Sequence, residues 1–161
     1  MLKIAIIIGS TRPGRKGETV GKWAYDIARK RNDAEFELVD IADFNLPLLD
    51  EPMPPTFGQY SDNHTRAWSA KIASFNGFVF VTPEYNHGTC AALKNAIDFL
   101  YQKWTNKAAG FIRYGGPVPS RGTTRTIPNG SRQKLQWLIG TGSPLISCRR
   151  VCSWPSGLTF W

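Results

Sequence analysis

With 161 residues, 42% of them hydrophobic and 12% aromatic, the chain is long and apolar enough to form one globular domain, and this composition excludes intrinsic disorder. The first apolar run, residues 4–8, is too short to span a membrane or to form a signal peptide, so we expect a cytoplasmic protein. The three cysteines fit no zinc spacing or disulfide framework, so we expect free thiols. The formal net charge of +8 is compatible with nucleic-acid binding, but residues 1–116 hold 14 Lys and Arg against 12 Asp and Glu, whereas the last 45 residues hold six basic residues and no acid.

Strand-like and helix-like patterns alternate along residues 3–114. Residues 3–9 and 77–81 are continuous apolar runs, which are typical of strands covered on both faces. Residues 35–41 alternate as a more exposed strand does, and the proline-rich segment 46–56 cannot form a regular element. The alternation predicts an α/β fold with a doubly wound parallel sheet. The predicted strands are 3–9, 35–41, 77–81 and 108–114, and the predicted helices are 18–31, 63–75 and 89–104.

The helix predicted at 89–104 also suggests a contact surface. Its apolar stripe faces the core and consists of Leu93, Ala96, Ile97, Leu100 and Trp104. Phe99 and Tyr101 lie off this stripe, so we expect them to belong to a surface that binds a partner.

Two unusual turns follow the first and third predicted strands. Residues 9–17 read GSTRPGRKG, and residues 83–88 read PEYNHG. In an open parallel sheet, ligands bind beyond the carboxyl ends of the strands, where the strand order reverses. A strand order of 2-1-3-4-5 places that crevice between the first and third strands. We therefore expect the two turns to hold opposite ends of one ligand.

The first turn favours a phosphate group. Its glycines let backbone N–H groups approach a ligand, and the helix that follows adds the positive end of its dipole. Ser10 and Thr11 offer hydroxyl donors, and Arg12 offers a planar fork matched to phosphate oxygens. The patterns G-x-x-x-x-G-K-[ST] and G-x-G-x-x-G are both absent from this turn. An ordinary glycine- and proline-rich loop with solvated cations explains the turn alone equally well.

The second turn is suited to a flat heteroaromatic ring. Tyr85 can lie along a ring face, Asn86 can bond to a polar edge, and Gly88 permits close approach of the backbone. Glu84 and His87 have the chemistry of a general acid and base, but a carboxylate at a helix entry and a surface imidazole explain them more simply. Hydride transfer through a flavin needs no protein base, because the cofactor carries the chemistry. We therefore assign no catalytic side chain and no metal ligand.

These two turns, together with ALKNAIDFL at 92–100, resemble the NAD(P)H-dependent FMN reductase family, whose fold is flavodoxin-like. The resemblance covers about residues 1–116. It implies that Ser10, Arg12 and the backbone near Gly17 hold the FMN phosphate, and we add the neighbouring Thr11. It further implies that the second turn lines the isoalloxazine ring and that a third, glycine-rich loop borders the flavin. The residues concerned are Pro83, Glu84, Tyr85, Asn86, His87, Gly88, Tyr114, Gly115 and Gly116.

The resemblance also implies a reaction and an assembly. The cofactor is FMN, the co-substrate is NADPH or NADH, and the electron acceptor is a quinone, an azo compound, a metal oxyanion or free flavin. Family members form dimers or tetramers across the helix that matches residues 93–101, so we expect a homodimer or homotetramer with no specific nucleic acid and no membrane. A flavin- or nucleotide-binding module with little or no turnover is the alternative. A nucleic-acid binder is a third hypothesis, although no recognition motif supports it.

Residues 117–161 depart from the family pattern. Gly, Pro, Ser and Thr make up 21 of these 45 residues, and the hydrophobic periodicity is weak. A short helix at 131–139 and a strand at 144–151 are doubtful candidates for the last helix and strand. We hypothesise that codons after about Tyr114 are read out of frame, or come from a different exon or a retained intron. A divergent tail that still completes the fold is the alternative. We therefore divide the one domain into a core, 1–116, and an atypical tail, 117–161.

Overall fold

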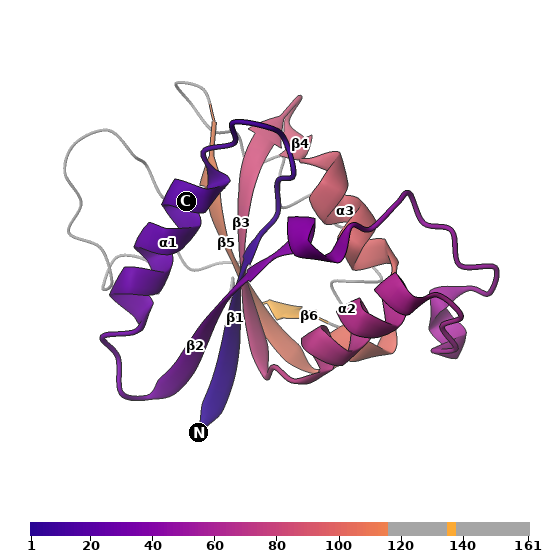
Figure 1. Cartoon of the computed structure of the whole chain (residues 1–161). Helices are drawn as coiled ribbons and strands as arrows, with labels where there is room; N and C mark the ends of the chain where they lie inside the picture. Colours follow the sequence, from indigo (N-terminus) through magenta and orange to yellow (C-terminus); the bar gives the residue numbers. More distant parts are fainter. Residues whose placement is uncertain (116–134, 138–161) are drawn as a thin grey trace.

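A six-stranded sheet forms the centre of the computed structural model, which describes residues 1–115 and 135–137 (Figure 1). Five strands are parallel, in the order β2-β1-β3-β5-β6, and the short β4 pairs antiparallel with the end of β3. Because β4 only extends β3 as a hairpin, this order confirms the flavodoxin-like fold and the predicted order 2-1-3-4 of its first four strands, while the fifth position is taken by residues 135–137. The strands are β1 (Leu2–Ile8), β2 (Ala34–Asp40), β3 (Gly77–Tyr85), β4 (Gly88–Thr89), β5 (Lys107–Tyr114) and β6 (Leu135–Trp137).

Helices cover both faces of the sheet. Figure 1 shows α1 (Gly17–Ala28) on one side and α2 (Asn63–Ala73) and α3 (Ala91–Asp98) on the other. Successive side chains of a strand point to opposite faces. In β1, Ile6 therefore clusters with Ala24 of α1, whereas Ile7 clusters with Trp68 of α2 and Leu93 of α3. Burying an isoleucine in this way contributes roughly 1.5–3 kcal/mol, which explains why the first apolar run becomes an interior strand of the sheet.

The predicted helix at 89–104 is wrong at both ends. α3 ends at Asp98 and is followed by the 3₁₀ helix η3 (Gln102–Trp104). Two buried indoles explain the end of α3: Trp68 Nε1 donates to Ala96 O at 2.8 Å, and Trp104 Nε1 donates to Ile97 O at 3.1 Å. The two indole N–H groups therefore satisfy backbone carbonyl groups in the last turn of α3, where the helix ends.

The partner surface predicted at Phe99 is also wrong. Phe99 is fully buried, and its ring lies edge-on to His64 with 5.7 Å between the ring centres. Phe99 keeps a helical backbone and its N–H donates to Asn95 O, so its side chain belongs to the core cluster together with Leu93 and Trp104. Tyr101, which lies beyond that turn, is exposed.

The short helix predicted at 131–139 is replaced, at 135–137, by β6. The backbone of this segment pairs in parallel with the first three residues of β5, from Lys107 to Ala109, so a sheet ladder takes the place of helical hydrogen bonds. The predicted strand at 144–151 lies outside the described residues. No helix in the described part of the chain is both long enough and apolar enough to cross a membrane.

Candidate functional site

The ends of β1 and β3 are tied together at the carboxyl edge of the sheet, at the top of Figure 1. Gly9 N–H donates to Val81 O at 2.8 Å, and Cys90 Sγ donates to Gly9 O at 3.0 Å. A Cβ atom on Gly9 would lie 3.0 Å from a side-chain atom of Leu93, so glycine permits this close packing. The structure therefore brings the two unusual turns to the same edge of the sheet.

A β-turn shapes the loop that follows β1. Arg15 N–H donates to Arg12 O at 3.1 Å, with Pro13 and Gly14 at the central positions. Gly14 has a φ of 67°, which a type II turn requires at its third residue, and proline suits the second. Ser10 is buried, and its Oγ accepts from Arg12 N–H at 3.4 Å. The loop is therefore a defined turn rather than an irregular connection.

The predicted phosphate-binding residues surround the start of α1. The side chains of Thr11 and Arg12 are exposed, and Gly17 is the buried first residue of the helix. Lys16 is the N-cap and makes no side-chain capping hydrogen bond, so no cap side chain occupies the N–H groups of the first turn, where the helix dipole is positive. A Cβ atom on Gly17 would lie 2.7 Å from Tyr114 Oη, so the missing side chain admits the tyrosine hydroxyl.

Arg15, which the sequence prediction did not include, is bonded to three partners. Nη1 donates to Ser10 O at 2.6 Å, and Nη2 lies 2.8 Å from Glu18 Oε1 and 2.5 Å from Asp40 Oδ2. Asp40 Oδ1 also accepts from Ala42 N–H at 2.9 Å, at the start of the 3₁₀ helix η1 (Ile41–Phe44). Burial raises the pKa of the Asp40 carboxyl, although the Ala42 hydrogen bond and the Arg15 charge oppose that rise.

The second turn is the end of β3 and the tip of a hairpin. Pro83, Glu84 and Tyr85 belong to β3, and Tyr85 pairs with Gly88 of β4. Asn86 and His87 form the two-residue connection with φ values of 50° and 62°. Positive φ at both central residues is the signature of a type I′ turn, whose twist matches that of paired strands. Tyr85 and His87 are exposed at this tip, whereas Pro83 is buried.

Glu84 lies between β3 and β5 in an ion pair that the sequence prediction missed. Its Oε2 lies 3.9 Å from Arg113 Nη1, and its Oε1 lies 3.8 Å from His87 Nδ1. The side chains of Glu84 and Arg113 are only 9% and 6% exposed, whereas that of His87 is 84% exposed. The sequence signal for this pair is an arginine at position 113, near the end of the mainly apolar strand 107–114. Gly115 lies against Glu84, because a Cβ atom there would be 3.4 Å from Glu84 Cβ; Gly116 is outside the described residues.

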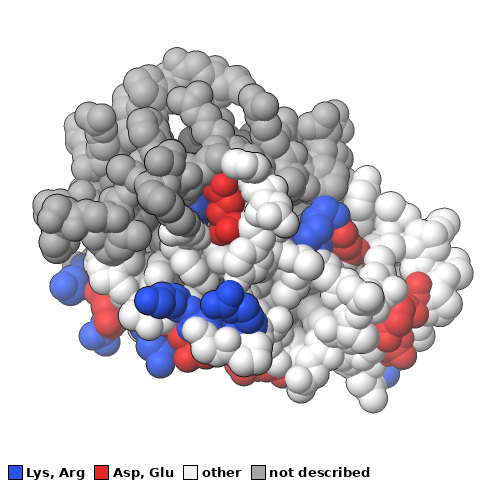
Figure 2. All heavy atoms as spheres, turned by 90° about the horizontal axis from the view of Figure 1, so that it is seen from above, with Lys and Arg blue, Asp and Glu red and all other residues white. Residues whose placement is uncertain are grey.

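Tyr114, at the end of β5, lies among residues of both turns. Burial raises the pKa of its hydroxyl to about 12; Tyr85 and Cys90 raise it as well, whereas Arg15 and Arg12 lower it. Tyr114 pairs with Pro83 of the second turn in the register of β3 and β5, and its hydroxyl lies beside Gly17, the last residue of the first turn, so one tyrosine adjoins both turns. Figure 2 looks onto this end of the sheet, where basic and acidic side chains share one face.

A cavity of about 380 Å³ lies beside the first turn. The side-chain amide of Asn95, on α3, donates to Pro47 O at 2.5 Å and accepts from Leu49 N–H at 3.0 Å, which holds the proline-rich segment 46–56 against that helix. The cavity is thus enclosed by the first turn, by η1 and the residues after it, and by α3. Its lining consists of Thr11, Ile41, Ala42, Asn45, Leu46, Ala92, Asn95 and Ala96.

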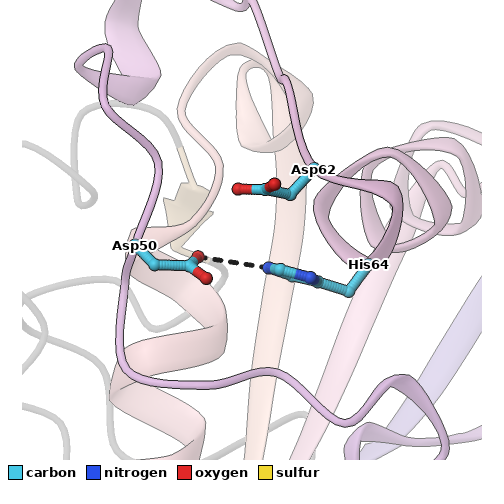
Figure 3. Close-up of side chains that lie close together, drawn as sticks. All are labelled: Asp50, Asp62 and His64. Atoms are coloured by element: carbon cyan, nitrogen blue, oxygen red, sulfur yellow. Dashed lines mark hydrogen bonds and ion pairs between the residues drawn. The ribbon is translucent and has the colours of Figure 1, made fainter.

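Three potential metal ligands lie between the proline-rich segment, which carries Asp50, and the start of α2 (Figure 3). Asp50, Asp62 and His64 have ligand atoms that all lie within 4.8 Å of one another, and His64 Nε2 is 3.1 Å from Asp50 Oδ1. Asp62 is the N-cap of α2 but makes no side-chain capping bond. The contact between His64 and Asp50 joins the segment to α2, so the group already has a structural role.

Glu51 completes this connection between the proline-rich segment and α2. Its carboxylate accepts from Ser61 N–H at 3.0 Å, from Ser61 Oγ at 2.8 Å and from Asp62 N–H at 3.2 Å. Burial opposes ionisation of Glu51, but the hydrogen bonds from Ser61 and Asp62 prevail and lower its pKa to about 2. The carboxylate therefore stabilises the start of α2 in place of Asp62.

Comparison with known proteins gives one consistent result. The family model described as NADPH-dependent FMN reductase matches residues 2–127, beyond the end at 116 expected from the sequence. The NAD(P)H-dependent FMN reductase ntnL of Nectria sp is 46% identical over 121 residues, which cover 71% of this chain and 60% of that protein. The NAD(P)H-dependent FMN reductase C4B3.06c of Schizosaccharomyces pombe is 43% identical over 116 residues, which cover 71% of this chain and 58% of that protein. The chain thus spans about 60% of the length of these curated relatives.

The fold also has a close counterpart among solved structures. The flavoenzyme NAD(P)H:(acceptor) oxidoreductase FerB of Paracoccus denitrificans superimposes with a TM-score of 0.66 at 20% sequence identity. The superposition covers 89% of this chain and 78% of FerB. At that identity the likeness shows a shared fold.

Proposed function

We propose, from the premise that this chain belongs to the NADPH-dependent FMN reductase family, that it binds FMN and oxidises NADPH or NADH. The chemistry that FMN supplies when bound is acceptance of a hydride from NAD(P)H and transfer of electrons to an acceptor. The acceptor class includes quinones, azo compounds, metal oxyanions and free flavin, and a small molecule of this kind is the expected partner. The two substrates use the site in turn.

The described residues fit the two ends of FMN. The positive end of α1, with no side-chain cap, the hydroxyls of Ser10 and Thr11, and the exposed Arg12 are suitable donors for a phosphate. The observation that carries the proposal is the position of Tyr114, which pairs with Pro83 of the second turn and places its hydroxyl beside Gly17 of the first. It means that a single ligand can contact both turns.

The ring end of the site is a surface for binding and orientation. Tyr85, at 41% exposed, offers an aromatic face. Neither Glu84 nor His87 is assigned a proton-transfer role. Glu84 is paired with Arg113, and the His87 imidazole is exposed, so the chain contributes orientation rather than acid–base chemistry.

We also propose a homodimer or homotetramer in the cytoplasm, with no nucleic-acid partner. Support for self-association comes from large apolar side chains that are exposed on the proline-rich segment and after α3. They are Leu48, Leu49, Met53, Phe57 and Tyr101.

The experiment that tests the function is spectroscopic. Purified full-length protein is expected to be yellow or to become yellow with added FMN, and to bleach when NADPH or NADH is added without oxygen. Readmitting oxygen or adding a quinone should restore the colour. Yellow protein that does not bleach would instead indicate a binding module without turnover, and colourless protein that does not bind FMN would disprove the proposal.

A further inference from the structure

We propose that Arg15 and Asp40 are positioning residues for the phosphate: their ion pair holds the loop after β1 in its binding shape, while neither residue contacts the ligand. The inference rests on the proposed function, because it concerns how the site receives FMN. It separates the two arginines of the loop into a ligand-facing one, Arg12, and a structural one, Arg15.

Arg15 connects separate parts of the loop through its fork. Nη1 donates to Ser10 O at the start of the loop, and the backbone N–H of Arg15 closes the β-turn on Arg12 O. Nη2 bonds to Asp40 at the end of β2 and to Glu18 in the first turn of α1. The side chains of Arg15 and Asp40 are only 12% and 17% exposed. A guanidinium committed in this way fixes backbone geometry and has little capacity left for an anion.

The charge of Asp40 argues for the same role. A carboxylate near a phosphate site weakens anion binding through Coulomb repulsion, so simple electrostatics disfavours an acid there. Asp40 nevertheless bonds to Arg15 and to Ala42 N–H, and thereby attaches the loop to η1. The geometry therefore gives it a structural task that outweighs the repulsion.

The two possible roles predict opposite results for Asp40→Asn. If charge alone matters, removing a negative charge strengthens FMN binding. If the ion pair positions the loop, the same substitution weakens it. Arg15→Lys separates the roles again, because lysine keeps the charge but lacks the fork that reaches Ser10, Glu18 and Asp40 together.

The measurement compares FMN with riboflavin, which lacks the phosphate. Affinities of the full chain for both ligands are obtained from flavin fluorescence quenching at one salt concentration, and thermal unfolding is recorded without flavin. We expect Asp40→Asn and Arg15→Lys each to reduce the preference for FMN over riboflavin by about tenfold, equivalent to about 1.4 kcal/mol. The matched controls are Asp33→Asn and Arg31→Lys, which alter an ion pair whose side chains are 58% and 48% exposed. They are expected to leave the preference unchanged.

The outcomes distinguish this inference from the proposed function. Wild-type protein with no preference for FMN would contradict the proposed function itself. A wild-type preference that Asp40→Asn leaves intact or increases would overturn only the positioning role. Full retention of the preference by Arg15→Lys would also overturn the positioning role, because it would indicate that only the charge of Arg15 matters. Equal losses of affinity for FMN and riboflavin would overturn it as well, because they would indicate general damage to the fold.

Discussion

Arg12 and Arg15 are three positions apart, yet their surroundings differ. Arg15 is bonded to Ser10, Glu18 and Asp40, whereas the side chain of Arg12 is exposed beside the start of α1. The spacing in the sequence identified a basic loop but could not show which cation is available, because Asp40 is 25 residues away and meets Arg15 only in the folded chain. The same limit applies to Arg113, whose partner Glu84 lies on another strand.

At the residue scale, we predict that Arg12→Ala weakens FMN binding and leaves riboflavin binding nearly unchanged. The loss should be about tenfold, or about 1.4 kcal/mol, because one charge-assisted contact to the phosphate disappears. Equilibrium titration of both flavins measures it. Arg29→Ala, which removes an exposed arginine paired with Asp26, is the matched control. Unchanged FMN affinity in Arg12→Ala would remove the role assigned to this side chain.

At the scale of elements, the proline-rich segment is attached to the two helices on one face of the sheet. Asn95 joins it to α3, and Glu51, together with the contact between His64 and Asp50, joins it to α2. The sequence excluded any regular element at 46–56, which is wrong at the end of the segment, where the 3₁₀ helix η2 (Pro55–Phe57) begins. It also did not indicate these attachments, which depend on residues up to 48 positions away. These contacts therefore hold the segment in place beside the cavity next to the first turn.

We predict that Glu51→Gln lowers the free energy of unfolding at pH 7 by roughly 1–2 kcal/mol, a value reduced from the full linkage effect to allow for solvent screening. Because the pKa of Glu51 is lowered from 4.5 to about 2, its stabilising effect is complete above pH 4.5 and is lost as the pH falls towards 2. The difference between wild type and variant should therefore shrink with acid. Urea denaturation at several pH values tests this.

The control for that experiment is Glu35→Gln, which neutralises an exposed acid on β2. It should leave stability at pH 7 nearly unchanged. A Glu51→Gln variant as stable as the wild type at pH 7, or a deficit that stays constant down to pH 2, would contradict the stabilising role of the carboxylate.

At the scale of the whole molecule, the alternation of apolar strands and amphipathic helices was sufficient to predict a parallel α/β sheet, whereas the strand order was part of the resemblance to a flavodoxin-like family. Periodicity was less reliable at boundaries: it did not reveal that Trp68 and Trp104 end α3 or that residues 135–137 join the sheet beside β5. Both errors arise from contacts between distant segments. Where such contacts override local preference, a pattern in one segment cannot predict the outcome.

We propose that codons after about Tyr114 are read in a shifted frame or come from a different exon or a retained intron. The abrupt change in composition and charge after residue 116 supports this. Translating the other two frames of the gene beyond that codon is expected to reveal an amphipathic helix followed by an apolar strand. If neither frame encodes them, the divergent-tail alternative stands.

At the hairpin tip between β3 and β4, relief of backbone strain and rigidity of the tip favour different residues. Asn86 and His87 both adopt left-handed backbone conformations, which cost a non-glycine residue roughly 1–2 kcal/mol. Glycine at position 87 would relieve part of that strain but would make the unfolded chain and the tip more flexible. Selection for heat resistance and selection for a rigid edge at the proposed ring site would therefore favour different residues at the same position.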